Sequence, residues 1–234
     1  MKINKVTITG ADDKINHIDL LNLSIKYPFV EWSILFSTSR QGLERYPSNT
    51  WISELNNYNI LLSAHFCGWF SNEVLEKSNI DLLKNLSPIF KRIQLNYNFK
   101  RSKNWNINPI IEYAKQNPER SIIFQHNNNN SDTLNELIWN SPRNIHFLYD
   151  ASGGNGLYDD SIFRADPFSD YTGYAGGINS DNVDDVCKMI TENTNNSNCW
   201  IDLESGIRTN NQFDLVKVES ILNKTSNFIK NEYY

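Results

Sequence analysis

The chain has 234 residues, of which 39% are hydrophobic and 12% aromatic, a composition typical of a folded globular protein. Lys and Arg number 22 against 27 Asp and Glu, and this mildly acidic balance argues against nucleic-acid and anionic-membrane partners. No apolar run reaches the roughly 18 residues of a membrane-spanning helix, and three cysteines without a CxxC pair exclude a disulfide framework and argue against a structural zinc site.

Eight short apolar segments predict β-strands. Each is rich in Ile, Leu, Phe or Tyr and nearly continuous, as in a sheet that is buried on both faces. In chain order they are residues 6–9, 32–36, 60–64, 92–95, 121–124, 145–149, 171–175 and 199–203.

Amphipathic segments between these strands predict helices. Ser71 is expected to cap one helix, and Pro109 stands where another begins. The segment 158–168 is rich in Asp and Pro, and we expect a loop with only a short helix there. The predicted helices are residues 14–26, 72–86, 110–116, 133–140, 182–192 and 212–230.

Alternation of strands and helices predicts an α/β protein with a parallel sheet. About eight such units suit a (β/α)8 TIM barrel, which takes roughly 250 residues. An open, doubly wound sheet is the alternative, but it would more naturally carry a Gly-rich loop after the first strand, where Gly10 stands alone. No linker is visible, so we predict that residues 1–234 form one barrel domain.

Glycines follow two neighbouring strands of this predicted barrel, at the end where such barrels carry their active sites. Gly176 and Gly177 follow the seventh strand, and Ser205 and Gly206 follow the eighth, each before a predicted helix. Glycine lets backbone N–H groups face an anion, and helix N-termini add positive potential. The sequence predicts a phosphate site here, although either turn alone is also compatible with an ordinary connection.

Three titratable side chains at strand ends are candidates for catalysis. Asp150 ends an apolar strand, where a carboxyl group can have a raised pKa and act as a general acid, or can simply cap its own loop. His65 and Cys67 alternate after the third strand as a possible acid–base or nucleophilic pair, or as packing residues. These three residues and His126 could together bind a metal, but their spacing in the sequence is not typical of a metal site, so we predict none.

The order of these motifs resembles that of the phosphoribosylanthranilate isomerases. The resemblance spans most of the chain, and its specific part is the C-terminal third. That family is a (β/α)8 barrel without cofactor or metal, and it catalyses an Amadori rearrangement of a phosphoribosylated aromatic amine. The matching segments are Thr9-Gly10, Gln94-Leu95, Tyr149-Asp150-Ala151, Gly153-Gly154-Asn155-Gly156, Ala175-Gly176-Gly177-Ile178, Asp202 and Ser205-Gly206-Ile207.

The resemblance implies roles for single residues. Asp150 resembles the family's general acid, and Arg40 loosely matches an arginine that helps to hold the substrate carboxylate. Arg45, nearby, is a second candidate for an anionic group or a solvated loop charge. Together with the strand ends, the resemblance suggests that substrate or phosphate is bound by Thr9, Arg40, Gln94, Asn96, Gln125, Gly154, Gly156, Gly176, Gly177, Ser205 and Gly206.

Two positions depart from the family pattern. Thr9 stands where the family has its catalytic cysteine, and a threonine hydroxyl cannot supply a thiolate base at neutral pH. Asn96 stands where the family has histidine. Either His65 or Cys67 has taken over as the base, or the barrel no longer performs this reaction.

Two functions follow from this pattern. In the first, an isomerase-like enzyme acts on another phosphorylated ribosyl or sugar compound, with Asp150 as the acid and His65 or Cys67 as the base. In the second, the barrel is a non-catalytic binder that sequesters a phosphorylated or nucleotide-like ligand. Either way we expect a phosphorylated small molecule as partner, no cofactor, no nucleic acid and no membrane. The first residues lack a signal-peptide core, so we expect a cytoplasmic protein. Related barrels occur as monomers and dimers, and we expect a monomer or homodimer.

Overall fold

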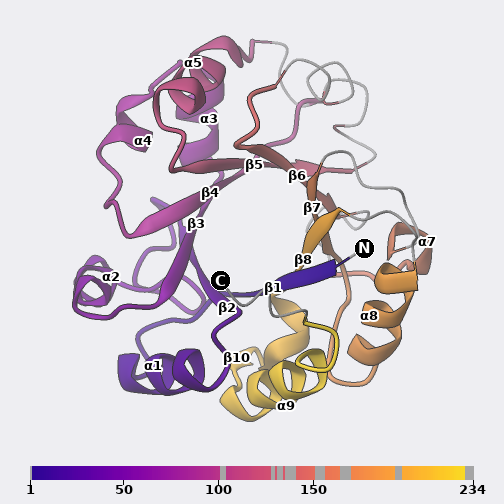
Figure 1. The fold of residues 1–234 in the computed structure, drawn as a ribbon. Helices are drawn as coiled ribbons and strands as arrows, with labels where there is room; N and C mark the ends of the chain where they lie inside the picture. The colour runs from indigo at the N-terminus through magenta and orange to yellow at the C-terminus, as the bar shows by residue number, and fades with distance from the viewer. Residues whose placement is uncertain are drawn as a thin grey trace.

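The computed structural model shows eight parallel strands that close into a barrel, each paired with its neighbours in sequence (Figure 1). The structure describes residues 2–100, 104–127, 130, 134, 141–150, 156–163, 170–192 and 197–229. Pairing of the last strand with the first closes the ring and confirms the predicted (β/α)8 TIM barrel. The strands are β1 (Lys2–Thr9), β2 (Val30–Phe36), β3 (Leu61–Cys67), β4 (Phe90–Asn96), β5 (Ser121–His126), β6 (Ile145–Asp150), β7 (Tyr171–Ala175) and β8 (Asn198–Leu203).

Helices ring the barrel on the outside (Figure 1). The described helices are α1 (His17–Lys26), α2 (Asn49–Glu54), α3 (Trp69–Glu76), α4 (Asp81–Lys84), α5 (Asn108–Gln116), α7 (Asp160–Phe163), α8 (Val183–Glu192) and α9 (Leu215–Thr225), with 3₁₀ turns η1 (Leu55–Asn57) and η2 (Ser205–Ile207). Among them, none combines the length and the apolar character needed to cross a membrane.

All eight predicted strands correspond to observed strands, and the difference that bears on the candidate site lies in β3. The sequence predicts a strand over 60–64, whereas β3 continues to Cys67. His65 and Cys67 therefore belong to the strand itself and lie on the same face of it, because successive side chains alternate.

The predicted helix over 72–86 is two helices. Ser78 has a φ of 54°, outside the helical region, and this residue separates α3 from α4. The first helix already begins at Trp69, so Ser71 is not its cap. Instead, the Ser71 hydroxyl donates a hydrogen bond to the carbonyl of Phe66.

The predicted helix over 212–230 is shorter than expected at both ends. Asp214 caps α9, and its carboxylate accepts the backbone N–H groups of Val216 and Lys217. Before this cap, β9 (Arg208–Thr209) and β10 (Gln212–Phe213) form an antiparallel hairpin. This hairpin was not visible as a strand pattern because each arm has only two residues.

Three further segments complete the comparison with the predicted helices. Helix α2 was not predicted, although Ser48 caps it by accepting the N–H of Trp51 at 3.2 Å. The predicted helix over 133–140 lies outside the described residues except for Leu134. Helix α7 confirms the short helix expected within 158–168, of which 164–168 also lie outside the described part.

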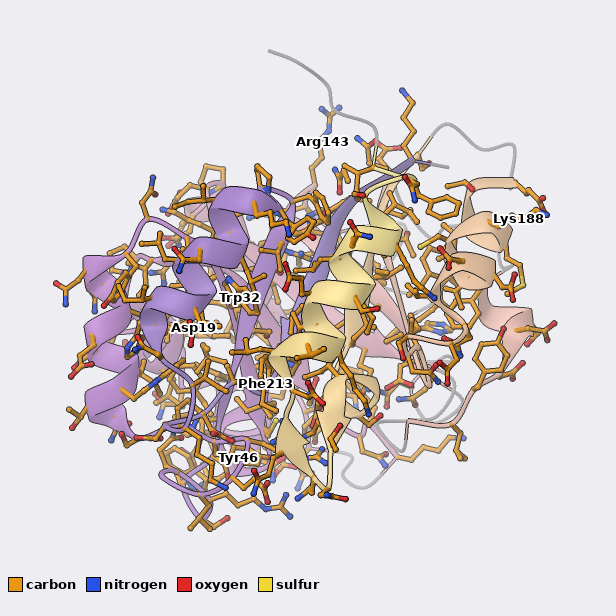
Figure 2. All side chains as sticks on the ribbon, turned by 90° about the horizontal axis from the view of Figure 1, so that it is seen from below. Asp19, Trp32, Tyr46, Arg143, Lys188 and Phe213 are labelled. Carbon is orange, nitrogen blue, oxygen red and sulfur yellow. The ribbon has the colours of Figure 1, made fainter. Side chains whose placement is uncertain are left out.

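An apolar layer between sheet and helices supplies most of the core. Trp32 on β2 is fully buried beside α1 (Figure 2), and its indole N–H donates a 2.8 Å hydrogen bond to Ser24. Burying a large apolar side chain stabilises a fold by about 1.5–3 kcal/mol.

Tyr46 and Arg143 mark the two ends of the barrel in Figure 2, Tyr46 after β2 and Arg143 before β6. The end of the barrel that carries Tyr46 is therefore the end at which the strands finish.

Inside the barrel, polar side chains gather in two layers. We call the first, near the strand beginnings, the lower layer; it consists of Glu31, Arg92, Tyr171 and Trp200. Arg92 Nη1 lies 2.8 Å from Glu31 Oε1, and the guanidinium carbon lies 4.1 Å from the centre of the Trp200 ring. The second, near the strand ends, we call the upper layer; it consists of Thr9, His65, Asp150 and Asp202, and it borders the candidate site.

Candidate functional site

A cavity of about 250 Å³ lies where the strands end. The predicted site residues that line it are His65, Gln94, Asn96, Gln125, Asp150, Gly156, Gly176, Gly177 and Ser205. Arg45, the second candidate for an anionic group, also lines it, together with Leu148, Ala175, Ile178, Asp202, Leu203 and Glu204, for which no binding role was predicted. Side chains from widely separated parts of the sequence thus meet at one end of the barrel.

Five predicted residues are not part of this lining. Gly154 lies outside the described residues. The Arg40 guanidinium lies over the Tyr46 ring instead, 5.6 Å from its centre. Thr9 and Cys67 lie beside the cavity, each bonded to a residue that lines it. A Cβ atom on Gly206 would lie 1.9 Å from the carbonyl oxygen of Ile178, so this glycine permits close contact between two loops.

Glycines bring the chain segments after β6, β7 and β8 into contact. Gly177 has a φ of 66°, and a Cβ atom there would lie 2.6 Å from the backbone nitrogen of Tyr158. Gly156 has a φ of 67°, and its Cβ atom would lie 2.5 Å from the Ser205 hydroxyl. Only glycine adopts both this conformation and this packing without strain.

This contact leaves backbone donors beside the cavity. The N–H groups of Gly176, Gly177 and Ser205 donate no hydrogen bond within the described part of the chain. Asn182 holds the loop that carries Gly176 and Gly177. Its side chain donates a 2.9 Å hydrogen bond to the Gly177 carbonyl and accepts a 2.8 Å hydrogen bond from the N–H of Asn179. Fixed, unpaired N–H groups at a concave surface are the donors that phosphate groups use.

Asp150 faces the cavity from β6. It is 5% exposed, and Gln125 on β5 donates a hydrogen bond of 2.5 Å to its Oδ2. Ala175 on β7 pairs in register with Asp150 on one side and with Asp202 on the other. Two strand spacings of about 4.8 Å therefore separate the backbones of the two acidic residues by roughly 10 Å, with a small side chain on the strand between them.

Asp202 is the most perturbed acid of the site. Its Oδ1 accepts a 2.7 Å hydrogen bond from the Thr9 hydroxyl, and its Oδ2 lies 3.6 Å from Nε2 of His65. Burial raises the pKa of Asp202 to about 7, with smaller raising effects of Glu204 and Glu31, and with lowering effects of the Thr9 hydrogen bond and of Arg92. This carboxyl group therefore exchanges its proton near neutral pH.

His65 and Cys67 differ from the expected acid–base pair. Burial, assisted by the positive charge of Arg92, lowers the pKa of His65 to about 3, so the imidazole is neutral at pH 7. Burial raises the pKa of Cys67 to about 11, which keeps it as a thiol. The sulfur accepts a 3.5 Å hydrogen bond from Asn96. These environments give neither residue a protonation change near pH 7.

Arg45 is the cation at the rim of the cavity. Its backbone has a φ of 72°, and its N–H donates 2.9 Å to Oδ2 of Asp12. Its guanidinium lies 2.9 Å from the Glu204 carboxylate and also bonds Asn211. The rim cation is therefore already paired with an acid of the same cavity.

The lining has more acids than bases and several amides. Asp150, Asp202 and Glu204 face one arginine. Gln94 donates 2.8 Å to Asn96, while its buried Oε1 has no hydrogen-bond partner among the described residues. A buried polar atom without a partner is costly, and a bound hydroxyl group would satisfy it.

The described residues do not bring three His, Cys, Asp or Glu side chains together as a metal site. His126 lies 5.4 Å from Tyr149, centre to centre, in an edge-to-face ring contact. It follows Gln125, which lines the cavity, so the two side chains point to opposite faces of β5.

Comparison with known proteins identifies the barrel type. No protein-family model and no curated protein matches the chain. Among solved structures, phosphoribosyl anthranilate isomerase from Thermotoga maritima is similar with a TM-score of 0.60 and 15% identity, over 95% of this chain and 98% of that one. The fold is phosphoribosylanthranilate isomerase-like.

Two further solved structures are similar to this chain. N-(5'-phosphoribosyl)anthranilate isomerase from Pyrococcus furiosus has a TM-score of 0.59 and 16% identity, over 95% of this chain and 98% of that one. The 3-hexulose-6-phosphate synthase from Salmonella typhimurium has a TM-score of 0.51 and 12% identity, over 96% of this chain and 99% of that one. At such identities the likeness establishes the barrel fold, and the chemistry has to be argued from the site.

Proposed function

We propose that this chain is an enzyme that isomerises a phosphorylated sugar or ribosyl compound by acid–base catalysis. It would be a diverged relative of the phosphoribosylanthranilate isomerases that lacks their catalytic cysteine. The observation that carries the proposal is one cavity that combines the buried Asp150 with unpaired N–H groups of glycine-rich loops. The similar structures named for phosphorylated ribosyl and hexulose compounds support the same substrate class.

The phosphate end of the substrate would lie against Gly176, Gly177 and Ser205. Their N–H groups come from two neighbouring loops and lie on the same side of the cavity as Gly156. Backbone donors hold a dianion without a competing side-chain charge. A phosphate bound there directs the rest of the molecule toward Asp150 and Asp202.

The body of the substrate would be a neutral polyhydroxyl group. Carboxylates and the amides of Gln94, Asn96 and Gln125 bond hydroxyl groups well, and the unpaired Gln94 Oε1 needs a donor. A carboxylate on the substrate would face three acids and an Arg45 that is already paired with Glu204. This charge balance disfavours an aromatic acid such as the family's anthranilate moiety.

Asp150 would act as the general acid. From β6 it lines the cavity, and the hydrogen bond from Gln125 fixes the orientation of its carboxyl group. Protonation of a ring or carbonyl oxygen would open the sugar and activate the neighbouring C–H bond. A positioned general acid contributes about 10²–10⁴-fold to a rate.

The alternative is a non-catalytic binder of a phosphorylated ligand. The neutral imidazole of His65 and the protonated thiol of Cys67 favour it, because neither supplies an effective base at pH 7. The two functions share the phosphate contacts and differ in whether the ligand leaves unchanged.

Incubation of the protein with a small-molecule extract of cells, followed by mass spectrometry of bound and free compounds, tests the proposal. An enzyme depletes a phosphorylated compound and produces an isomer of equal mass, whereas a binder releases the compound unchanged. The Asp150→Asn protein should lose at least about 100-fold in turnover and still retain the compound. Full activity of this variant would remove Asp150 from the mechanism.

Two further variants control this experiment. Ser205→Asp places a negative charge at an exposed position of the phosphate contacts and should abolish retention. Asp19→Asn makes an acid-to-amide change on the outer helix α1 (Figure 2) and should alter neither turnover nor retention. If Ser205→Asp retains the compound as well as the unmodified protein does, the phosphate site is wrongly placed.

A further inference from the structure

We infer that Asp202 is the proton acceptor of the reaction, with Thr9 as the residue that positions it. The inference rests on the proposed function and adds the base that the cysteine-free site otherwise lacks. It also makes Thr9, at the position of the family cysteine, the partner of the base and not the base itself.

The geometry places Asp202 where a base is needed. It lines the cavity from β8, Asp150 lines it from β6, and Ala175 on β7 pairs in register with both. Their backbones are roughly 10 Å apart, and because both residues line one cavity, a bound sugar can contact both carboxyl groups. An acid and a base can then act on neighbouring atoms from opposite sides.

Two contacts hold the Asp202 carboxyl group in place. The Thr9 hydroxyl donates 2.7 Å to Oδ1, and this bond spans 193 residues of sequence from β1 to β8. The other oxygen, Oδ2, has the neutral imidazole of His65 at 3.6 Å and forms no hydrogen bond with the described residues. Thr9 therefore fixes one oxygen and leaves the other for a substrate proton.

The charges around Asp202 suit a base that is reused in each cycle. Glu204, directly after the same strand, and Glu31 on β2 disfavour its ionised form, while Arg92 on β4 favours it. Arg45 is engaged with Glu204, and Arg92 with Glu31, so no cation forms an ion pair with Asp202 among the described residues. Burial dominates and raises its pKa to about 7, which allows both uptake and return of a proton at neutral pH.

The proton balance of an aldose-to-ketose isomerisation closes with these two acids. Asp202 takes the proton from C2, the electron pair forms the C1–C2 double bond, and Asp150 gives a proton to O1. Asp202 then returns its proton to C1, the C2–O2 double bond forms, and the O2 proton passes to Asp150. Both carboxyl groups end as they began, and no oxidant or reductant is consumed.

Hydrogen exchange in D2O measures this step directly. Ribose 5-phosphate and glucose 6-phosphate serve as probes, and loss of the C2–H signal is followed by proton NMR. The unmodified protein should exchange this hydrogen with at least one probe. Asp202→Asn should slow the exchange by at least about 100-fold, while its affinity for inorganic phosphate stays within about twofold. Asp19→Asn is again the matched control.

The outcomes separate the two proposals. If neither probe exchanges with the unmodified protein, the proposed isomerase function fails and the inference with it. If the unmodified protein exchanges and Asp202→Asn exchanges equally fast, the function stands and the base is another group. If Asp202→Asn loses phosphate affinity too, it has lost its structure, and the infrared measurement below decides.

Infrared spectroscopy tests Asp202 without any substrate. The unmodified protein should show a carboxyl C=O stretch that fades between about pH 6 and 8, around the pKa of about 7, and that is absent in Asp202→Asn. If the unmodified protein lacks this band, the inference is overturned.

The same measurement tests Thr9. Thr9→Val removes the hydrogen bond that lowers the pKa of Asp202 and should move the midpoint of its titration to higher pH, whereas Thr9→Ser should keep the midpoint. An unmoved midpoint in Thr9→Val would exclude Thr9 as the positioning residue.

Discussion

The two polar layers inside the barrel both contain buried acidic side chains, and they differ in whether those acids have a counter-charge. In the lower layer, Glu31 and Arg92 are both almost fully buried and lie 2.8 Å apart, so each charge has its counter-charge. In the upper layer, Asp202 is equally buried, yet it has a hydroxyl group and a neutral imidazole for neighbours. The lower layer therefore pairs its charges, whereas burial without an ionised partner among the described residues raises the pKa of Asp202 in the upper layer to about 7.

The difference shows how one barrel separates stability from chemistry. A buried ion pair stays charged across the working pH range, but removal of one partner is strongly destabilising. A buried acid without a counter-charge costs stability when it ionises and gains a pKa suited to proton transfer. We therefore expect substitutions in the lower layer to affect mainly folding, and those in the upper layer mainly activity.

The largest expected effect is that of Glu31→Gln. The change leaves Arg92 charged, buried and without its carboxylate. We expect a loss of about 3–5 kcal/mol in the free energy of unfolding, measured by urea denaturation at pH 7. A loss below about 1 kcal/mol would mean that the Trp200 ring alone satisfies the guanidinium.

Asp202→Asn should have an intermediate effect of the opposite sign. Because the folded-state pKa of Asp202 is raised from 3.8 to about 7, the folded protein binds the proton more tightly and loses stability as the pH rises through this window. The variant cannot ionise, so its gain over the unmodified protein should be on the order of 1–4 kcal/mol at pH 8 and much smaller at pH 4. Equal gains at both pH values would contradict the raised pKa.

Arg45→Met should have the smallest effect on stability. The pair with Glu204 is partly exposed, with 29% and 40% of the two side chains accessible, and such pairs contribute roughly 0–1 kcal/mol. The variant should therefore change the melting temperature little. If Arg45 nevertheless contacts the substrate, the KM for the compound identified from the extract will rise while kcat stays the same.

The fold could be read from the sequence because each strand is buried on both faces. Near-continuous apolar runs such as 145–149 mark strands of this kind, and the helical segments between them imply parallel pairing. Helix ends were less visible. Ser78, with its φ of 54°, interrupts a regular apolar stripe, and no local pattern announces it.

The site could be read only where function leaves a local pattern. Glycines after two neighbouring strands and an acid at the end of an apolar strand are such patterns, and Gly177 and Asp150 do meet in one cavity. Asp202 belongs to the segments that match the family pattern, but no role was predicted for it, because it lies within a strand and its partner Thr9 is 193 residues away. Arg45 lines the cavity through a loop conformation, a φ of 72°, that spacing cannot reveal.

A single cation joins the two layers. Arg92 pairs with Glu31 below, and its charge also lowers the pKa of His65 and opposes the raised pKa of Asp202 above. A substitution at a position that never touches a ligand would thus retune the pH at which the site operates. Selection for activity in a more acidic or more alkaline medium would be expected to collect changes around Arg92, so that adaptation of this barrel is epistatic across its interior.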